Sequence, residues 1–242
     1  VQASYWTLIA LASVFFFVRM PFYLMSTRGT VEPKREEEFK FNLKSRKVIA
    51  KFVMLTALGR MGYEVFFSLF PFYVNKKFGV KSDALGVLFF ISWFVTAGAN
   101  IIAPMVSARL KALRTIVGAL VLCTPFYFMI PLAPNLPLLS ALFIIRLGIA
   151  NLSSPLIASL FMRLLYPEEK ATANSINMMT SMGVATVATW LGGQLMEQIS
   201  LDFPVYMGAG VYIVYAASFY FLLKNESERE LEQRTLKEKK AN

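Results

Sequence analysis

The strongest constraint on this sequence is the recurrence of long apolar runs. A helix needs about 20 apolar residues to cross the hydrocarbon core of a bilayer. The runs lack the alternation of period two that a membrane-spanning strand would show. The sequence therefore predicts an all-α, polytopic transmembrane helix bundle of about seven spans. The seven runs occupy residues 4–24, 48–74, 84–108, 115–133, 137–164, 170–196 and 204–223.

Composition supports a membrane protein. Apolar residues make up 56% of the 242 residues, and the mean hydropathy is +0.53. Charged residues make up only 17% of the chain, whereas soluble domains carry about 25%. Most side chains of this sequence are therefore apolar and suited to contact with lipid or with other helices.

The connections between the runs predict how the chain is organised. A long polar stretch separates the first two runs, while every later connection is about ten residues or shorter, which makes neighbouring helices antiparallel. We therefore expect four parts. They are a separate first helix at 1–24, a linker at 25–47, a six-helix bundle at 48–223 and a polar tail at 224–242.

The basic residues predict the orientation. When the connections are assigned alternately to the two sides of the membrane, 19 Lys and Arg residues fall on one side and three on the other. Positive charge is retained in the cytoplasm, so the linker and the tail are expected there, in a multi-pass protein of the cell membrane. The net charge of +10 is then a consequence of topology, and we expect no nucleic-acid partner.

Cysteine and histidine usage excludes several kinds of chemistry. Cys123 is the only cysteine and there is no histidine, which excludes disulfides and the usual Cys/His metal sites. We therefore predict no metal, no cofactor and no catalytic residue. The chain starts with Val1 and has no signal-peptide pattern before or within its first run, so we expect its start to be truncated.

Two connecting segments resemble motifs of a known family. The segment from Pro104 to Arg114 contains basic residues in a tight turn, although Ala108 stands where the motif has an acid. The segment from Tyr166 to Ser175 combines a proline, charges and small residues before a helix. With the spacing of the spans, they resemble the major facilitator superfamily from its sixth to its twelfth helix. The loop-motif residues are Pro104, Arg109, Lys111 and Arg114.

This resemblance implies a function. Members of the family move small solutes by alternating access to a central cavity, so the chain is expected to be the C-terminal half of a secondary active transporter. It could be proton-coupled, as a symporter or antiporter, or an efflux carrier. Its expected partners are the lipid bilayer, a small-molecule substrate and the N-terminal six-helix half of the same transporter.

Charged residues within spans are the first candidates for the site, because they are costly in a membrane. Arg60 and Glu64 are four residues apart in the second run, so their side chains can meet. Arg146 in the fifth run lies at a similar depth and could meet Glu64 across a cavity. We predict that Glu64 couples transport to protons or cations, with Arg146 as its partner or as an anchor for an anionic substrate; the alternative is a static Arg60–Glu64 pair.

Polar and aromatic residues within the spans are secondary candidates. Asn151 and Asn177 are predicted to contact substrate or to take part in coupling. Glycine pairs at 192–193 and 208–210 predict close helix contacts. The predicted cavity-lining residues are Tyr63, Phe67, Trp93, Asn100, Ser154, Asn174 and Ser181.

Three other functions stay open. A seven-helix receptor has the same number of spans, but the last run has no lysine for a retinal Schiff base. A membrane-embedded enzyme would need His, Asp or Cys clusters within the spans, where Glu64 is the only acid. A structural fragment that does not transport is the third alternative.

Overall fold

The structure is a computed structural model that describes residues 13–14, 17, 21, 44–110 and 112–241. Most of the predicted first span and linker therefore lie outside the described residues. Residues Leu43–Asn242 form one compact unit, and the fold below is that of this unit. Its described residues contain helices and no strand, as the sequence predicts.

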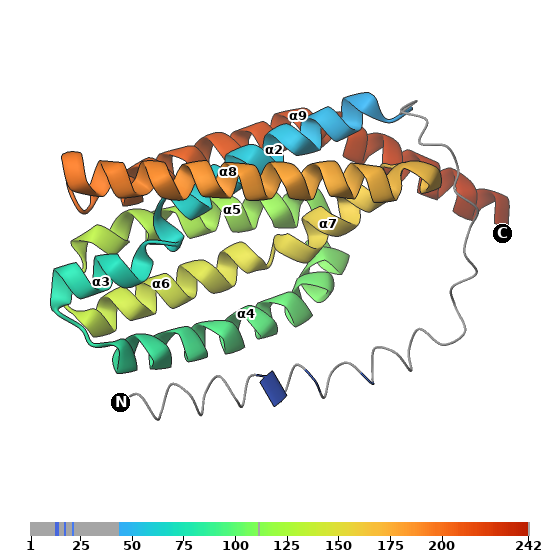
Figure 1. Ribbon diagram of the computed structural model, residues 1–242. Coiled ribbons are helices and arrows are strands. Elements are labelled where there is room, and N and C mark those ends of the chain that lie inside the picture. The colour runs from blue at the N-terminus through green and yellow to red at the C-terminus, as the bar shows by residue number, and fades with distance from the viewer. Residues whose placement is uncertain (1–12, 15–16, 18–20, 22–43, 111, 242) are drawn as a thin grey trace. The chain divides into compact units, whose positions relative to one another are not determined.

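The helices are joined by short connections, and successive spans run antiparallel to one another (Figure 1). Two of the predicted spans are each divided into two helices, and two 3-10 turns lie at helix ends. The elements are α2 (Arg46–Phe67), α3 (Phe70–Phe78), α4 (Ser82–Leu110), α5 (Ala112–Met129), η1 (Ile130–Leu132), α6 (Leu136–Asn151), α7 (Ser154–Arg163), η2 (Pro167–Glu169), α8 (Lys170–Gln198) and α9 (Phe203–Ala241).

Five segments of the described chain are long and apolar enough to cross a membrane. The sixth expected span, α8, is 29 residues long but is not among them. Polar residues such as Asn174, Ser175 and Asn177 lower its hydropathy. The five segments are Arg46–Phe78, Ser82–Ala108, Ala112–Leu132, Leu136–Arg163 and Phe203–Lys224.

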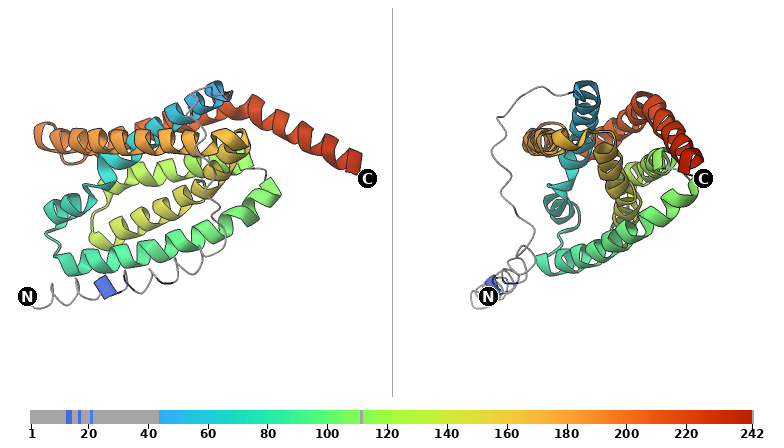
Figure 2. Two further views of the ribbon diagram at one scale, coloured as in Figure 1. Left: turned by 45° about the vertical axis from the view of Figure 1, so that its right-hand side comes forward. Right: turned by 90° about the vertical axis from the view of Figure 1, so that its right-hand side faces the viewer.

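The helices form a bundle in which α2 contacts both α8 and α9. Helix α9 also packs on α5, which contacts α6, and α6 contacts α4. Seen along the helices, α6 and α7 lie in the middle of the group (Figure 2). A side chain on the inner face of α6 can therefore reach residues from several other helices.

Aromatic side chains fill the core between the early helices. The Phe70 and Phe143 rings stack with centroids 3.8 Å apart, which joins α3 to α6. Phe89 from α4 packs edge-on against both rings. This cluster fixes the position of α3 against the middle of the bundle.

Glycines let α2 approach its two neighbours closely. A methyl group added at Gly192 of α8 would lie 2.0 Å from the carbonyl oxygen of Val65. At Gly208 of α9 it would lie 2.8 Å from the carbonyl oxygen of Gly62. Gly193 and Gly210 have nothing within 4 Å of such a methyl group, so only one glycine of each predicted pair makes a close helix contact.

Candidate substrate and coupling site

The centre of the candidate site is a charged pair on α2. The Arg60 guanidinium lies 3.2 Å from Glu64 Oε1, and the Ser68 hydroxyl donates to Glu64 Oε2 at 2.5 Å. The Glu64 side chain is 11% exposed and that of Arg60 is 39% exposed. The spacing of four residues predicts this contact, because such side chains lie on the same face of a helix.

The helix changes direction directly after this pair. Helix α2 ends at Phe67 and α3 begins at Phe70, so Ser68 lies at the break itself. Pro71 follows in the first turn of α3, where its missing N–H removes no helical hydrogen bond. The carboxylate is therefore held by one residue within α2 and by one residue at a backbone break.

Arg146 occupies a different environment within the bundle. It is 2% exposed, and its guanidinium carbon lies 4.3 Å from the Tyr127 ring centroid and 4.9 Å from that of Tyr212. The Tyr63 ring is 5.3 Å away. Three tyrosines from α5, α9 and α2 therefore surround the cation with the negative faces of their rings.

The tyrosine cage leaves part of the guanidinium without hydrogen bonds. Arg146 Nε and Nη2 have no hydrogen-bond partner among the described residues. No carboxylate oxygen that the structure describes lies within 4.0 Å of this side chain, so Arg146 and Glu64 are not paired here. Tyr63 connects the two groups, because it directly precedes Glu64 in the chain and its ring faces Arg146.

A second polar contact joins α2 to α8. The Thr56 hydroxyl donates to Asn177 Oδ1 at 2.6 Å. Thr56 lies one turn before Arg60, so this contact is on the same face as the charged pair. Of the predicted site residues on α8, Asn177 meets α2, whereas Asn174 contacts Met178 within its own helix and Ser181 is partly exposed.

The α6–α7 span is also broken at polar residues. Helix α6 ends at Asn151 and α7 begins at Ser154. The Asn151 side chain donates to the Leu147 carbonyl at 2.8 Å, while Ser154 is exposed. Both residues therefore lie at a break, but neither contacts Glu64 or Arg146 in this arrangement.

The remaining predicted residues are dispersed. Trp93 is 67% exposed and shares an outward face of α4 with Asn100. Phe67 packs against Phe143 with centroids 5.8 Å apart, so it belongs to the aromatic core. Tyr63 stacks on Phe67 at 4.2 Å as well as facing Arg146.

The loop-motif residues lie around the α4–α5 turn. Pro104 is inside α4, and Arg114 is exposed in the first turn of α5. Arg109 is in the last turn of α4, and Lys111 lies outside the described residues. Helix α4 ends at Leu110 and α5 begins at Ala112.

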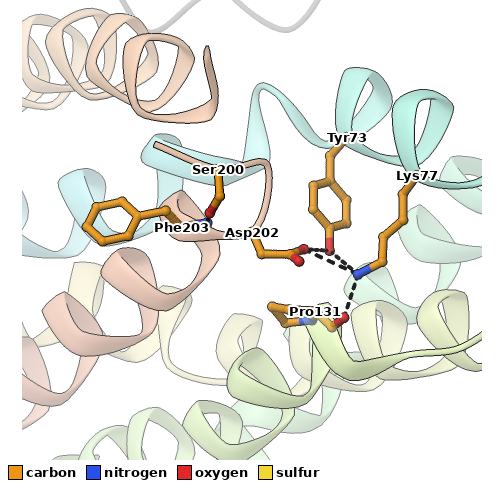
Figure 3. Close-up of polar contacts among 6 residues, drawn as sticks. All are labelled: Tyr73, Lys77, Pro131, Ser200, Asp202 and Phe203. Carbon is orange, nitrogen blue, oxygen red and sulfur yellow. Dashed lines mark hydrogen bonds and ion pairs between the residues drawn. The ribbon is translucent and has the colours of Figure 1, made fainter. Parts of the chain in front are cut away.

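The sequence did not indicate a polar cluster at the Lys77 end of the bundle (Figure 3). Tyr73 donates to Asp202 Oδ1 at 2.6 Å, and Lys77 Nζ lies 3.2 Å from the same oxygen. Lys77 also donates to Tyr73 at 2.9 Å and to the Pro131 carbonyl. The cluster ties α3 to η1 and to the α8–α9 loop; the i, i+4 spacing of Tyr73 and Lys77 was its only signal.

Glu169 forms a matching connection at the opposite end. Its carboxylate accepts hydrogen bonds from the backbone N–H groups of Lys44 and Ser45, the latter at 3.0 Å. Burial of the carboxyl opposes its ionisation, but these hydrogen bonds outweigh burial and hold the pKa of Glu169 below its usual value. The α7–α8 loop therefore fixes the start of α2 through a carboxylate at a helix N-terminus.

Two further observations concern metal ligands and similarity to known proteins. Among the described residues, no three His, Cys, Asp or Glu side chains are placed to hold a metal ion. A comparison with curated proteins found no match. The family model of the Major Facilitator Superfamily matches residues 1–185 and residues 52–241, which together span nearly the whole chain. The chain therefore belongs to the Major Facilitator Superfamily of membrane transporters.

Proposed function

We propose that this chain is the C-terminal half of a secondary active transporter that moves a small solute by alternating access. The family membership and the five apolar segments long enough to cross a membrane support this proposal. Its partner is an N-terminal six-helix half, which supplies the other wall of the cavity. Residues 1–24 are the last helix of that half, and 25–47 are the linker.

Glu64 is the proposed coupling residue, and its local geometry is the observation that carries this proposal. Within a membrane span, a carboxylate side chain that is 11% exposed needs positive charge or hydrogen-bond donors close to it. Arg60 and Ser68 supply them in this conformation. If the break at Ser68 opens during transport, Glu64 is released from these partners and becomes available to a proton or a cation.

Arg146 is proposed to bind an anionic part of the substrate or to pair with Glu64 in another conformation. Its two N–H-bearing nitrogens without partners support this role, because buried polar groups are otherwise hydrogen-bonded. Tyrosine rings stabilise the cation without neutralising it. An arriving carboxylate or phosphate would therefore complete its coordination.

Asn151 and Asn177 are proposed to contribute amide groups to the same pathway. Asn177 already meets α2 through Thr56, and Asn151 lies at the α6–α7 break. Movement at either break would change which polar groups these amides contact. Trp93, Asn100, Ser154, Asn174 and Ser181 are proposed to face the cavity in the complete transporter.

The test is Glu64→Gln in the complete transporter that contains this chain. Counterflow exchange and gradient-driven uptake are both measured in vesicles. If Glu64 couples transport, exchange persists while accumulation against a gradient is lost. Wild-type accumulation with wild-type pH dependence would refute the coupling role.

A matched variant separates coupling from a static structural pair. Glu64→Gln alone leaves the Arg60 cation without its anion. If the pair is structural, this single variant has a lower thermal stability, and adding Arg60→Gln restores that stability. Coupling predicts that the double variant still fails to accumulate solute, although it is stable. Restored accumulation in the double variant would identify the pair as structural.

A second test concerns the proposed second half. The 242-residue chain alone is expected to insert into the membrane but not to transport, because it forms only one wall of the cavity. Co-expression with an N-terminal six-helix half is expected to restore transport. Net transport by the purified chain alone in vesicles would contradict the proposal.

A further inference from the structure

An apolar groove runs along the outside of the bundle between α5 and α9. Its volume is about 430 Å³. Val117, Val121 and Phe128 line it from α5, and Ile213, Ala217 and Tyr220 line it from α9. The groove lies within two membrane-spanning segments, so any molecule that fills it has an apolar part.

The groove is separate from the candidate transport site. Val121 is 57% exposed and Ile213 is 52% exposed, so these walls face outward. Tyr127 and Tyr212, which surround Arg146, lie on the buried faces of the same two helices. A ligand in the groove would therefore contact the back of the helices that hold the Arg146 cage.

Two cations stand at one end of the groove. Arg114 is three residues before Val117 and seven before Val121, so it continues the groove-lining face of α5. Lys224 is four residues after Tyr220 on α9, and its Nζ lies 5.8 Å from the centroid of the Tyr220 ring. Both side chains are exposed, and they lie at the same end because the two helices are antiparallel.

We propose that this groove binds an anionic phospholipid. One acyl chain lies along the apolar walls, and the headgroup phosphate is bound by Arg114 and Lys224. Burial of the chain provides apolar contact, and the two cations select negative charge. A zwitterionic lipid places a positive group beside the same cations and binds less well. We assign the groove to a lipid because its apolar walls match an acyl chain and the two exposed cations at its end match a phosphate.

Native mass spectrometry of the full chain in detergent tests this proposal. The probes are phosphatidylglycerol and phosphatidylcholine with identical acyl chains. We expect phosphatidylglycerol to be retained preferentially, and its affinity to fall about fivefold for each of Arg114→Gln and Lys224→Gln. Glycerol 3-phosphate at the same concentration should not displace the lipid, because it has no acyl chain.

Matched variants identify the groove. The double variant Lys47→Gln, Lys170→Gln removes two exposed cations near other helix ends and should keep the wild-type lipid preference. Ala217→Phe fills the groove and should reduce retention of both lipids, whereas Val214→Phe on an exposed position outside the groove should not. Circular dichroism of each variant checks that its helices are intact.

Three results would overturn the proposal. They are equal retention of the two lipids by the wild-type chain, unchanged preference in the Arg114→Gln, Lys224→Gln double variant, and unchanged retention in Ala217→Phe. If the wild-type chain is recovered as a dimer and Ala217→Phe dissociates this dimer, the groove binds a second copy of the chain instead of a lipid.

Discussion

The guanidinium carbon of Arg146 lies 4.3 Å from the centroid of the Tyr127 ring, so a cation in the middle of the bundle rests on an aromatic face. The Tyr127 hydroxyl also donates to the Gly62 carbonyl at 3.1 Å. This tyrosine therefore has two separable roles: it holds α2 through its hydroxyl and stabilises Arg146 through its ring.

Variants of Tyr127 should separate these roles. Tyr127→Phe removes the hydrogen bond and is expected to lower the free energy of unfolding by about 1 kcal/mol. Tyr127→Leu also removes the cation–π contact, which is worth a further 0.5–2 kcal/mol or so. Unfolding in mixed micelles measures both. In an Arg146→Met background, the difference in unfolding free energy between Tyr127→Phe and Tyr127→Leu should become smaller. An unchanged difference would show that the ring does not act through the cation.

The two adjacent glycines of α8 should respond differently to alanine. Gly192→Ala places a methyl group 2.0 Å from the Val65 carbonyl oxygen, so α8 must move away from α2. We expect a loss of about 1–3 kcal/mol in unfolding free energy, as for other overpacked contacts. Gly193→Ala is the matched control, since nothing lies within 4 Å of its added methyl group. Equal unfolding midpoints for the two variants would contradict the α2–α8 contact.

Glu169 should give the chain a pH-dependent stability. Its pKa is lower in the folded chain than its ordinary value of 4.5, so the folded state favours the ionised carboxylate. The resulting stabilisation is fully present above pH 4.5 or so and is lost as the pH falls through the lower folded-state pKa.

The variant Glu169→Gln tests this assignment. It should lower the thermal unfolding midpoint at neutral pH and weaken the dependence of that midpoint on pH in the acidic range. Glu168→Gln changes an exposed neighbour and should leave both properties unchanged. If the two variants behaved alike, the hydrogen bonds assigned from the Lys44 and Ser45 amides to Glu169 would be contradicted.

The orientation of the chain can be tested by cysteine labelling in intact cells. Cys123 is fully buried and should give no background. Cysteines introduced at Ser26 or Asn242 should resist an impermeant thiol reagent, because the side with 19 basic residues is expected in the cytoplasm. A cysteine at the exposed Lys81, on the opposite side, should react. The reverse pattern would invert the topology.

Local sequence information determined the helical architecture and part of the site. Runs of apolar residues predicted the all-α bundle because each span satisfies its backbone hydrogen bonds within itself. The contact between Arg60 and Glu64 was also predictable, because a helix places residues four apart on one face. The breaks within two spans were not predicted, although Pro71 and Pro155 lie next to them.

The relative rotation of the helices was decided only by the tertiary structure. Periodicity places residues on a helix face but does not say which neighbour that face meets. The sequence could not show that tyrosines from three other helices surround Arg146, or that Gly192 rather than Gly193 meets α2. Nor could it pair Glu169 with a helix start 124 residues away. These contacts depend on packing between segments distant in the chain, whereas the five apolar spans follow from the chain's own hydropathy.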